Sequence, residues 1–300
     1  MILLDYNNAI IKDILESRLI GDKSDSIDMT VVDFDGVTYE VKTPNKKTEI
    51  YISIRWICFQ ELVSYGAQQI LEREYGQYLA PTPEPNYDAT LIIDVEQIPS
   101  DEETRQQLIQ KVSLLKRNLL AAPFEKAFSE QEEYEDNEKP NPTSTLMAVH
   151  YREEEAIYIK SSTDRVTVIF STKFKDETDK IFGKVFLQEF VDARRRRNQR
   201  APQVLYTVRE PPLELAHLNL GDHEDTSYVT FVLFPSHFVR GDVREETISR
   251  IQIFRDFLHY HIKCSKAYMH TRMRARVRDF LKVLNRAKPE VIGAEKKTIR

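Results

Sequence analysis

The side chains best suited to chemistry in this sequence are two cysteines, a closely spaced pair of histidines and an aspartate-rich turn. A cysteine thiolate can act as a nucleophile or bind a metal, often from a Cys-x-x-Cys pattern. Cys58 and Cys264 are far apart and belong to no such pattern. The sequence therefore predicts neither a disulfide framework nor a zinc site, and we interpret both residues as reduced thiols.

His259 and His261 are two residues apart in a segment with helical periodicity. Two positions along a helix correspond to a rotation of about 200°, so the two rings cannot chelate one metal from a common face. The stretch from Asp33 to Gly36 resembles part of a calcium-binding loop, but the remaining ligand spacing and the closing glutamate are missing. Asp35 and Gly36 stand between strand-like flanks and predict a hairpin turn.

The eight glycines are isolated from one another, so the sequence contains no P-loop and no Gly-x-Gly-x-x-Gly turn. It also lacks the Gly-x-Ser-x-Gly pattern that presents a serine nucleophile. A catalytic triad brought together only in space would leave no such signature. From these observations we predict a protein that is not an enzyme, with no catalytic, cofactor-binding or metal-binding residues and no cofactor.

The charge is divided unevenly along the chain. The whole sequence has 43 basic and 48 acidic residues, and its net charge of −5 argues against a general nucleic-acid binder. The segment 263–288 nevertheless holds nine basic residues against Asp279 alone, which makes it +8 and leaves −13 on the rest. The N-terminus lacks the features of a signal peptide, and no apolar run approaches the ~20 residues of a membrane span. We expect a soluble, cytoplasmic protein.

Hydrophobic periodicity predicts an α+β fold built from two similar modules, each a mostly antiparallel sheet with flanking helices. The first half has an opening helix over 3–15, strands within 27–41, 50–56 and 87–98, and helices over 59–78 and 101–128. We expect Pro123 to bend or interrupt the end of the last of these helices. The second half has strands at 146–152, 156–160, 166–174, 203–209 and 228–234, and helices over 179–194 and from 242 onwards.

The predicted domain boundaries follow this order of elements. They are a first module at 1–128, an acidic linker at 129–145, a second module at 146–241, a long helix at 242–288 that completes the second module, and a tail at 289–300. Two short matches support an internal duplication: the triplet at 102–104 recurs at 245–247, and 126–128 recurs almost unchanged at 266–268.

The final helix begins at a capping box formed by Asp242 and Glu245 and meets no breaker before Pro289. A helix of that length is ~70 Å long, whereas a 150-residue domain is ~40 Å across, so we expect the helix to overhang its domain. Its apolar stripe continues to the end and calls for a covering partner chain. The alternative is a kinked helix that folds back on itself. The stripe comprises Ile251, Phe254, Leu258, Ile262, Met269, Met273, Val277, Phe280 and Leu284.

Basic side chains occupy the other faces of this helix, and their positive charge favours an acidic partner over plain solvent. We predict that they contact such a partner, although any one of them can instead pair with acids of the chain that covers the stripe. The residues are Arg272, Arg274, Arg276, Arg278 and Lys282. A second basic run, 194–197 with Arg200, follows a predicted helix end, where cations also suit the helix dipole.

Long stretches of this sequence resemble one known family, that of subunit 2 of the actin-related protein 2/3 complex. The resemblance is most specific in the final helix, over 254–268, 270–274 and 279–287. It extends over essentially the whole chain, through the stretches 33–36, 115–118, 164–168, 183–186, 201–205, 209–215 and 230–235. The linker and the basic run 194–197 lie outside it.

The resemblance implies a non-catalytic scaffold subunit of the actin-branching complex. Its last helix would pack against the equivalent helix of subunit 4, and the pair would hold the actin-related proteins and contact the side of a mother actin filament. We assign the packing to Ile262, Met269, Met273, Val277, Phe280 and Leu284, and the filament contact to the five basic residues at 272–282. The rival hypothesis is a protein that binds nucleic acid or an anionic membrane through the same basic helix.

Overall fold

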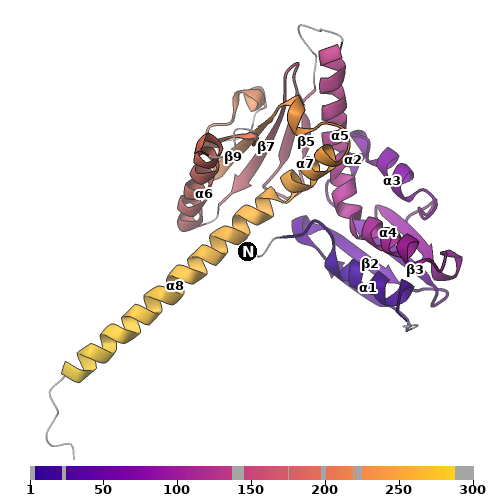
Figure 1. Cartoon of the computed structure of the whole chain (residues 1–300), viewed down its shortest axis with the longest axis horizontal. Coiled ribbons are helices and arrows are strands. Elements are labelled where there is room, and N and C mark those ends of the chain that lie inside the picture. Colours follow the sequence, from indigo (N-terminus) through magenta and orange to yellow (C-terminus); the bar gives the residue numbers. More distant parts are fainter. Residues whose placement is uncertain are drawn as a thin grey trace, which may run out of the picture. The chain divides into compact units, whose positions relative to one another are not determined.

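The computed structural model describes residues 4–21, 25–136, 145–174, 176–196, 201–218, 220 and 225–287. It divides the chain into two compact units, which meet in sequence between Leu258 and His259. The first unit contains both sheets (Figure 1).

The first half of the chain forms a four-stranded antiparallel sheet with the order β1-β2-β3-β4. Its elements are α1 (Ala9–Leu19), β1 (Asp28–Val32), β2 (Thr38–Lys42), β3 (Glu49–Arg55), α2 (Phe59–Ser64), α3 (Ala67–Tyr75), β4 (Ala89–Asp94), α4 (Glu102–Ser113) and α5 (Leu115–Asp136). Buried residues alternate with partly exposed ones along β2 and the first half of β3, which places one face of this sheet, with Tyr39, Val41 and Ile52, in the core.

The second half forms a five-stranded antiparallel sheet with the order β5-β6-β7-β9-β8. Its elements are β5 (Met147–Val149), β6 (Ile157–Ser161), β7 (Val166–Lys173), α6 (Glu177–Arg196), β8 (Gln203–Val208), β9 (Thr226–Leu233), α7 (Asp242–Gln252) and α8 (Phe254–Ala287). The central strand β7 is buried on both faces. Phe254 packs on Phe170 of one face, and a short 3₁₀ turn containing Leu215 packs near Ile169 of the other.

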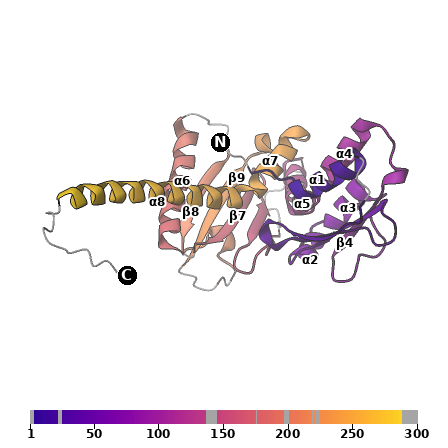
Figure 2. The ribbon, with the colours of Figure 1, turned by 90° about the horizontal axis from the view of Figure 1, so that it is seen from below.

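The predicted α+β architecture of two similar modules is confirmed, and the likeness extends to details. In both halves three antiparallel strands precede a helical segment, which is followed by β4 in the first half and by β8 and β9 in the second, and then by a pair of consecutive helices. Figure 2 shows the two halves with helices α4 and α7 labelled. Even the fifth strand of the second sheet has a counterpart, because Leu79 makes an isolated antiparallel bridge to Leu91 on the outer edge of β4. The first recurring triplet opens α4 and recurs within the first two turns of α7, and the second lies within α5 and α8.

Several predicted elements differ from those observed. The opening helix begins only at Ala9, because the side chain of Asn8 caps it by accepting a hydrogen bond from the Ile11 amide. The helix predicted over 59–78 is two helices, separated at Gly66, whose φ of 110° breaks the helical path. The predicted hairpin turn is confirmed, with positive φ at both Asp35 and Gly36.

The two long predicted helices are each broken once. The segment 101–128 is divided at Leu114 into α4 and α5, and Pro123 lies inside α5 instead of ending it. The segment from 242 is divided at Ile253 into α7 and α8, so the long helix begins at Phe254. The break lets α7 pack on α5 while Phe254 packs on the second sheet.

Helix α5 is the element that joins the two sheets, since it contacts α2 and α3 of the first module and β6 and β7 of the second. It also continues to Asp136 and thus includes residues 129–136 of the predicted linker. No proline occurs there before Pro140, so nothing in the backbone chemistry stops the helix earlier. Residues 137–144 of the linker, residue 288 of the predicted long helix and the tail 289–300 lie outside the described part of the chain.

Candidate interaction surface on helix α8

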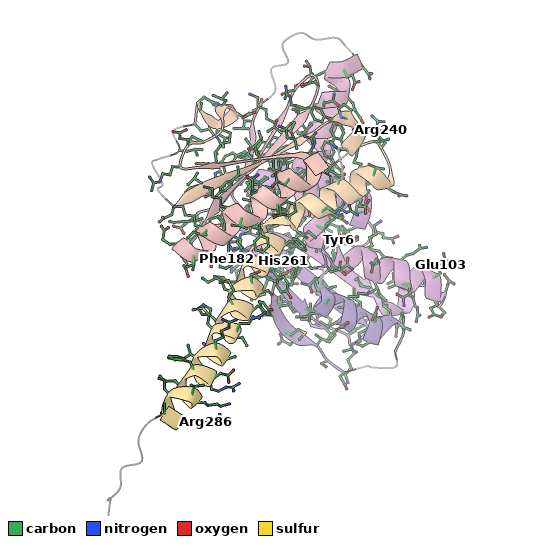
Figure 3. The ribbon with its side chains drawn as sticks, turned by 60° about the vertical axis from the view of Figure 1, so that its left-hand side comes forward. Tyr6, Glu103, Phe182, Arg240, His261 and Arg286 are labelled. Carbon is green, nitrogen blue, oxygen red and sulfur yellow. The ribbon has the colours of Figure 1, made fainter. Side chains whose placement is uncertain are left out.

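The helix α8 is a continuous run of 34 residues without glycine or proline. Asp256 lies in its first turn and Arg286 in its last, where each charge suits the helix dipole. The predicted site residues all belong to this one helix, and Figure 3 shows its side chains between the labelled residues His261 and Arg286.

The apolar stripe predicted to meet a partner is largely exposed. Ile262 is buried, whereas Met269, Met273, Val277, Phe280 and Leu284 each expose between 44% and 63% of their surface. These five side chains recur at intervals of three and four residues, so they lie along one side of the helix. Isolated exposed apolar residues are common on proteins, but a row of five is a candidate interface.

Two further apolar residues widen this row and were not part of the sequence-based prediction. They are Leu281 and Val283, and each exposes at least half of its surface. At about 100° per residue, these two side chains fall on opposite margins of the predicted stripe. A wider angular window applied to the sequence would have found them. We call the five exposed stripe residues together with Leu281 and Val283 the apolar row.

The basic residues border the apolar row on both sides. Arg274 and Arg278 lie toward one margin and Arg272 and Arg276 toward the other, while Lys282 continues the first series onto the side opposite Met273. A shallow groove of about 570 Å³ brings Arg274, Arg278 and Lys282 together with Met273, Val277 and Leu281. Its remaining lining residues are His270 and Asn285. Three of the five predicted filament-binding residues therefore line a groove together with two of the predicted packing residues, Met273 and Val277, whereas Arg272 and Arg276 do not line it.

Little negative charge on α8 compensates these cations. Lys282 Nζ lies 3.7 Å from Asp279 Oδ1, and Arg272 donates a hydrogen bond of 2.6 Å to the hydroxyl of Tyr268 while lying over its ring. Among the described residues, no ion pair involves Arg274, Arg276 or Arg278. The positive charge of these three arginines is therefore available to attract an acidic partner.

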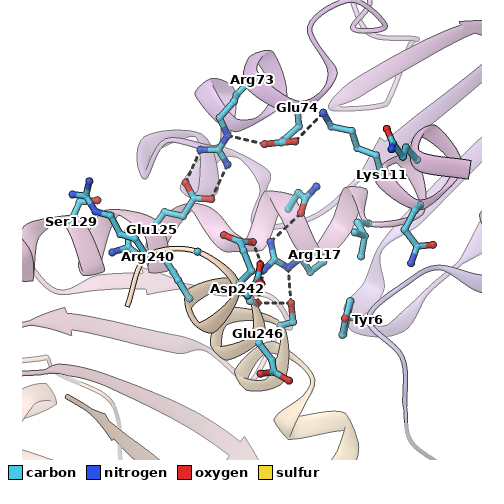
Figure 4. A pocket seen from close by; sticks show the side chains of 18 residues that line it. Tyr6, Arg73, Glu74, Lys111, Arg117, Glu125, Ser129, Arg240, Asp242 and Glu246 are labelled. Carbon is cyan, nitrogen blue, oxygen red and sulfur yellow. Dashed lines mark hydrogen bonds and ion pairs between the residues drawn. The ribbon is translucent and has the colours of Figure 1, made fainter. Parts of the chain in front are cut away.

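A second candidate is the open groove of about 1090 Å³ between α3, α4, α5 and α7 (Figure 4). It contains none of the predicted site residues. Arg73 forms two hydrogen bonds of 2.9 Å with Glu125, Lys111 lies 3.1 Å from Glu74, and Arg117 lies 2.8 Å from Glu245. Since its basic and acidic side chains are paired, the groove lacks the excess positive charge that a phosphate-binding site uses.

The residues first considered for chemistry lie apart from one another. Cys58 is buried at the start of α2, and burial raises the pKa of its thiol, which disfavours the reactive thiolate. Cys264 is exposed on α8. Within the described ranges, no group of three or more His, Cys, Asp and Glu side chains is arranged to hold a metal ion. None of the helices described is both long and apolar enough to cross a membrane.

The second basic run lies at the end of α6. There the Nε of Arg194 donates a hydrogen bond of 2.9 Å to the carbonyl oxygen of Ala201. The side chains at 195–197 and 200 are outside the described residues, so the prediction for this run stays a prediction.

Comparison with known proteins places the sequence in a family. A family model described as "Arp2/3 complex, 34 kD subunit p34-Arc" matches residues 52–291. A relative from Schizosaccharomyces pombe is 51% identical over 99% of this chain and 97% of its own, and one from Dictyostelium discoideum is 40% identical over 100% and 97%. Both are named actin-related protein 2/3 complex subunit 2. This chain belongs to the p34-Arc family of Arp2/3 complex subunits.

Proposed function

We propose that this chain is a non-catalytic scaffold subunit of an Arp2/3 complex in the cytoplasmic actin cytoskeleton. In this proposal α8 pairs with a helix of subunit 4, and the basic margins of α8 contact the side of a mother actin filament to support nucleation of branches. Family membership supports the assignment to the complex. The exposed apolar row of α8 carries the proposal that this helix is the pairing element.

The size of the apolar row supports pairing with a helix. If each large apolar side chain contributes about 1.5 kcal/mol or more on burial, the row offers on the order of ten kcal/mol, comparable to the stability of a domain. A groove with apolar residues at i, i+4 and i+8 fits the ridges of a second helix. The full chain without a covering helix is therefore expected to associate with itself or with chaperones.

The experiment that tests the proposal is purification of the tagged chain from its own cells, followed by mass spectrometry of the associated proteins. We expect the other subunits of the complex in equal amounts, with subunit 4 remaining bound to this chain after the complex is dissociated by mild denaturant. A monomeric, well-behaved chain that purifies alone would contradict the proposal.

A second candidate function is binding of nucleic acid or an anionic membrane, and one observation favours it. Arg272 lies over the exposed ring of Tyr268, and nucleic-acid surfaces combine basic with aromatic side chains in this way. Filter binding with random duplex and single-stranded DNA, and flotation with phosphatidylserine vesicles, distinguish this second candidate from the scaffold function. Submicromolar binding of either ligand by the assembled complex would favour the second candidate.

A further inference from the structure

The two sheets have four edge strands, β1 and β4 in the first and β5 and β8 in the second. Neighbouring groups or prolines protect three of these edges against pairing with another chain, and β1 lacks this protection. At the outer edge of β4, the amide of Ala80 donates to the Thr90 carbonyl over 2.9 Å, and the amide of Ile92 donates to the Tyr78 carbonyl over 2.7 Å. These bonds occupy the backbone groups that the strand would otherwise offer to another chain.

The edge of β5 is occupied by side chains from α2 and the residue that follows it. The hydroxyl of Tyr65 donates to the carbonyl of Ala148 and accepts from its amide, at 3.1 and 3.0 Å. The amide of His150 donates to a carboxylate oxygen of Glu61 over 2.7 Å. The edge strand β8 packs against α6. A proline also stands near each of its ends, Pro202 immediately before it and Pro211 shortly after it, which limits pairing beyond the strand.

The remaining edge, β1, has none of these protections. It contains no proline and no lysine, and the large apolar side chains of Met29, Val32 and the following Phe34 are exposed. The amide of Thr43 donates to the Ile27 carbonyl and that of Asp33 to the Val37 carbonyl, so alternate residues of β1 face β2. By this alternation the amides and carbonyls of residues 28, 30 and 32 point outward. Among the described residues, no backbone hydrogen bond occupies them.

The charge along this edge selects the kind of strand that fits it. Asp25 and Asp28 are exposed, and no ion pair of the described residues involves either. A second copy of β1 would offer no basic side chain to these carboxylates, because residues 25–34 contain neither lysine nor arginine. A strand in which basic and apolar residues alternate is complementary, because it can place its basic side chains on the face of Asp28 and its apolar ones on the opposite face, beside Met29.

We propose that β1 is a docking edge for an extended segment of a partner protein in which basic and apolar residues alternate. The segment adds a fifth strand to the first sheet by pairing with the outward groups of Asp28, Thr30 and Val32, and its basic residues face the acidic end of β1. This interaction is separate from the one proposed for α8, so either can fail without the other.

The test uses the assembled complex and a synthetic ten-residue peptide of alternating lysine and valine. Hydrogen exchange is followed at the amides of residues 28–32, and affinity is measured by fluorescence anisotropy. We expect the peptide to slow exchange at Asp28, Thr30 and Val32. A glutamate–valine peptide, and a lysine–valine peptide with alternate amides methylated, should each bind at least about tenfold more weakly. The proposal would be overturned if the amides of residues 28, 30 and 32 exchange fast in the complex and the peptide does not slow their exchange.

Two variants at one position isolate the backbone contribution. Thr30→Pro removes an outward amide without removing a ladder hydrogen bond, and should weaken peptide binding about tenfold. Thr30→Val keeps that amide and should bind within about twofold of the native chain. Equal binding by the proline variant would overturn the proposal, and if that variant does not fold, the methylated peptide makes the same test.

Two outcomes identify the occupant. If the outward amides are already protected in the complex and a carbodiimide joins Asp28 to a lysine of another subunit, that subunit supplies the strand and the proposal is supported. If they are protected by a second copy of β1, seen as a dimer of complexes that Thr30→Pro dissociates, the basic partner is excluded.

Discussion

The guanidinium of Arg152, in the second module, lies 2.7 Å from the carboxylate of Asp35, in the first hairpin turn of the chain. Lys116 approaches the other oxygen of the same carboxylate at 3.0 Å. Arg152 also lies 3.3 Å from Asp256, at the start of α8. One nearly buried carboxylate therefore ties together the first turn, helix α5 and the second module.

The pKa of this carboxyl shows how strongly its neighbours hold it. Burial by itself raises the pKa of Asp35, but the attraction of Lys116 and Arg152 outweighs burial and leaves the pKa below its ordinary value of 3.8. Nearby Asp256 is affected in the opposite direction, because burial and then repulsion from Asp35 raise its pKa. The two carboxyls consequently make opposite contributions to the dependence of stability on pH.

The first prediction is that Asp35→Asn lowers the free energy of unfolding by about 1–3 kcal/mol at pH 7, because it removes the nearly buried charge that the partly buried Lys116 and Arg152 share, although Arg152 keeps its contact with Asp256. Asparagine tolerates the positive φ at this position, so the variant tests the charge. Because the folded pKa of Asp35 is depressed, its contribution is present above pH 3.8 and is lost as the pH falls through the folded pKa. The unfolding free energies of the native protein and Asp35→Asn should therefore become equal once the pH is below the folded pKa of Asp35.

Urea unfolding followed by the fluorescence of Trp56 measures this effect, since the indole Nε1 donates to the Asp35 carbonyl over 3.0 Å. Asp164→Asn serves as the control, because Asp164 and Arg165 form an exposed pair whose loss should cost less than about 1 kcal/mol. A difference between native protein and Asp35→Asn that stays constant from about pH 7 down to well below the ordinary pKa of aspartate would show that the charge is not the cause.

The second prediction concerns Gly183 in α6. Alanine is the better helix former by about 1 kcal/mol, but a Cβ at this position would lie 2.8 Å from Cζ of the buried Phe174 ring. Overpacking of this kind costs about 1–3 kcal/mol, so Gly183→Ala should destabilise the protein by about 1 kcal/mol. Combining it with Phe174→Leu should restore part of the loss in a thermal unfolding series. A stabilising effect of Gly183→Ala alone would mean that the ring moves aside freely.

Much of this fold was predictable because local rules and tertiary packing agree. Alternation over 50–56 predicted the strand β3, and Asp35 with Gly36 predicted the turn. The breaks at Leu114 and Ile253 were not predictable, because neither position has a glycine or a proline.

Packing between distant segments causes the second break. Arg117 of α5 donates to the Ser249 hydroxyl at 2.9 Å and to the Glu245 carbonyl at 2.8 Å, and Gln252 donates back to the Arg117 carbonyl at 3.1 Å. These bonds hold α7 on α5, while Phe254 packs on the second sheet. The residues of 242–288 alone could not predict this break, because it depends on contacts with α5 and with the second sheet.

The candidate surface on α8 was predictable for a related reason. Its residues lie on one continuous helix, so spacing alone determines which side chains share a side. The sequence-based prediction missed the closeness of the two kinds of residue, because Arg274 and Arg278 line the same groove as Met273 and Val277. A partner that covers the apolar row would therefore also meet these two cations.

The third prediction tests the apolar row. Replacing both Met273 and Val277 with aspartate places two charges in the middle of the proposed helix pair, and burying them unpaired costs several kcal/mol. We expect subunit 4 to be absent when the tagged variant is purified. The control replaces Leu213 and Val239 with aspartate; these residues are also exposed but lie outside α8, and the control should retain subunit 4. Stoichiometric recovery of subunit 4 with the α8 variant would exclude this pairing.

The last prediction tests the basic margin that lines the groove. Arg274→Glu with Arg278→Glu changes the charge of α8 by −4, and the reconstituted complex should then bind filaments several-fold more weakly, because a few surface pairs contribute about 0–1 kcal/mol each. Binding by the native complex should itself weaken with salt, since the Debye length falls from ~10 Å at 0.1 M to ~3 Å at 1 M.

Filament co-sedimentation and branch density, each measured at low and high salt, report this change. Lys184→Glu with Arg165→Glu gives the same change in net charge outside α8 and should leave filament binding near the native value. If the α8 variant assembles with subunit 4 and loses filament affinity only at low salt, the cations act on the filament through their charge. If it fails to assemble, Arg274 and Arg278 serve the subunit interface that their place beside Met273 and Val277 also allows. Unchanged co-sedimentation at both salt concentrations would exclude this margin and direct attention to Arg194 and the residues that follow it.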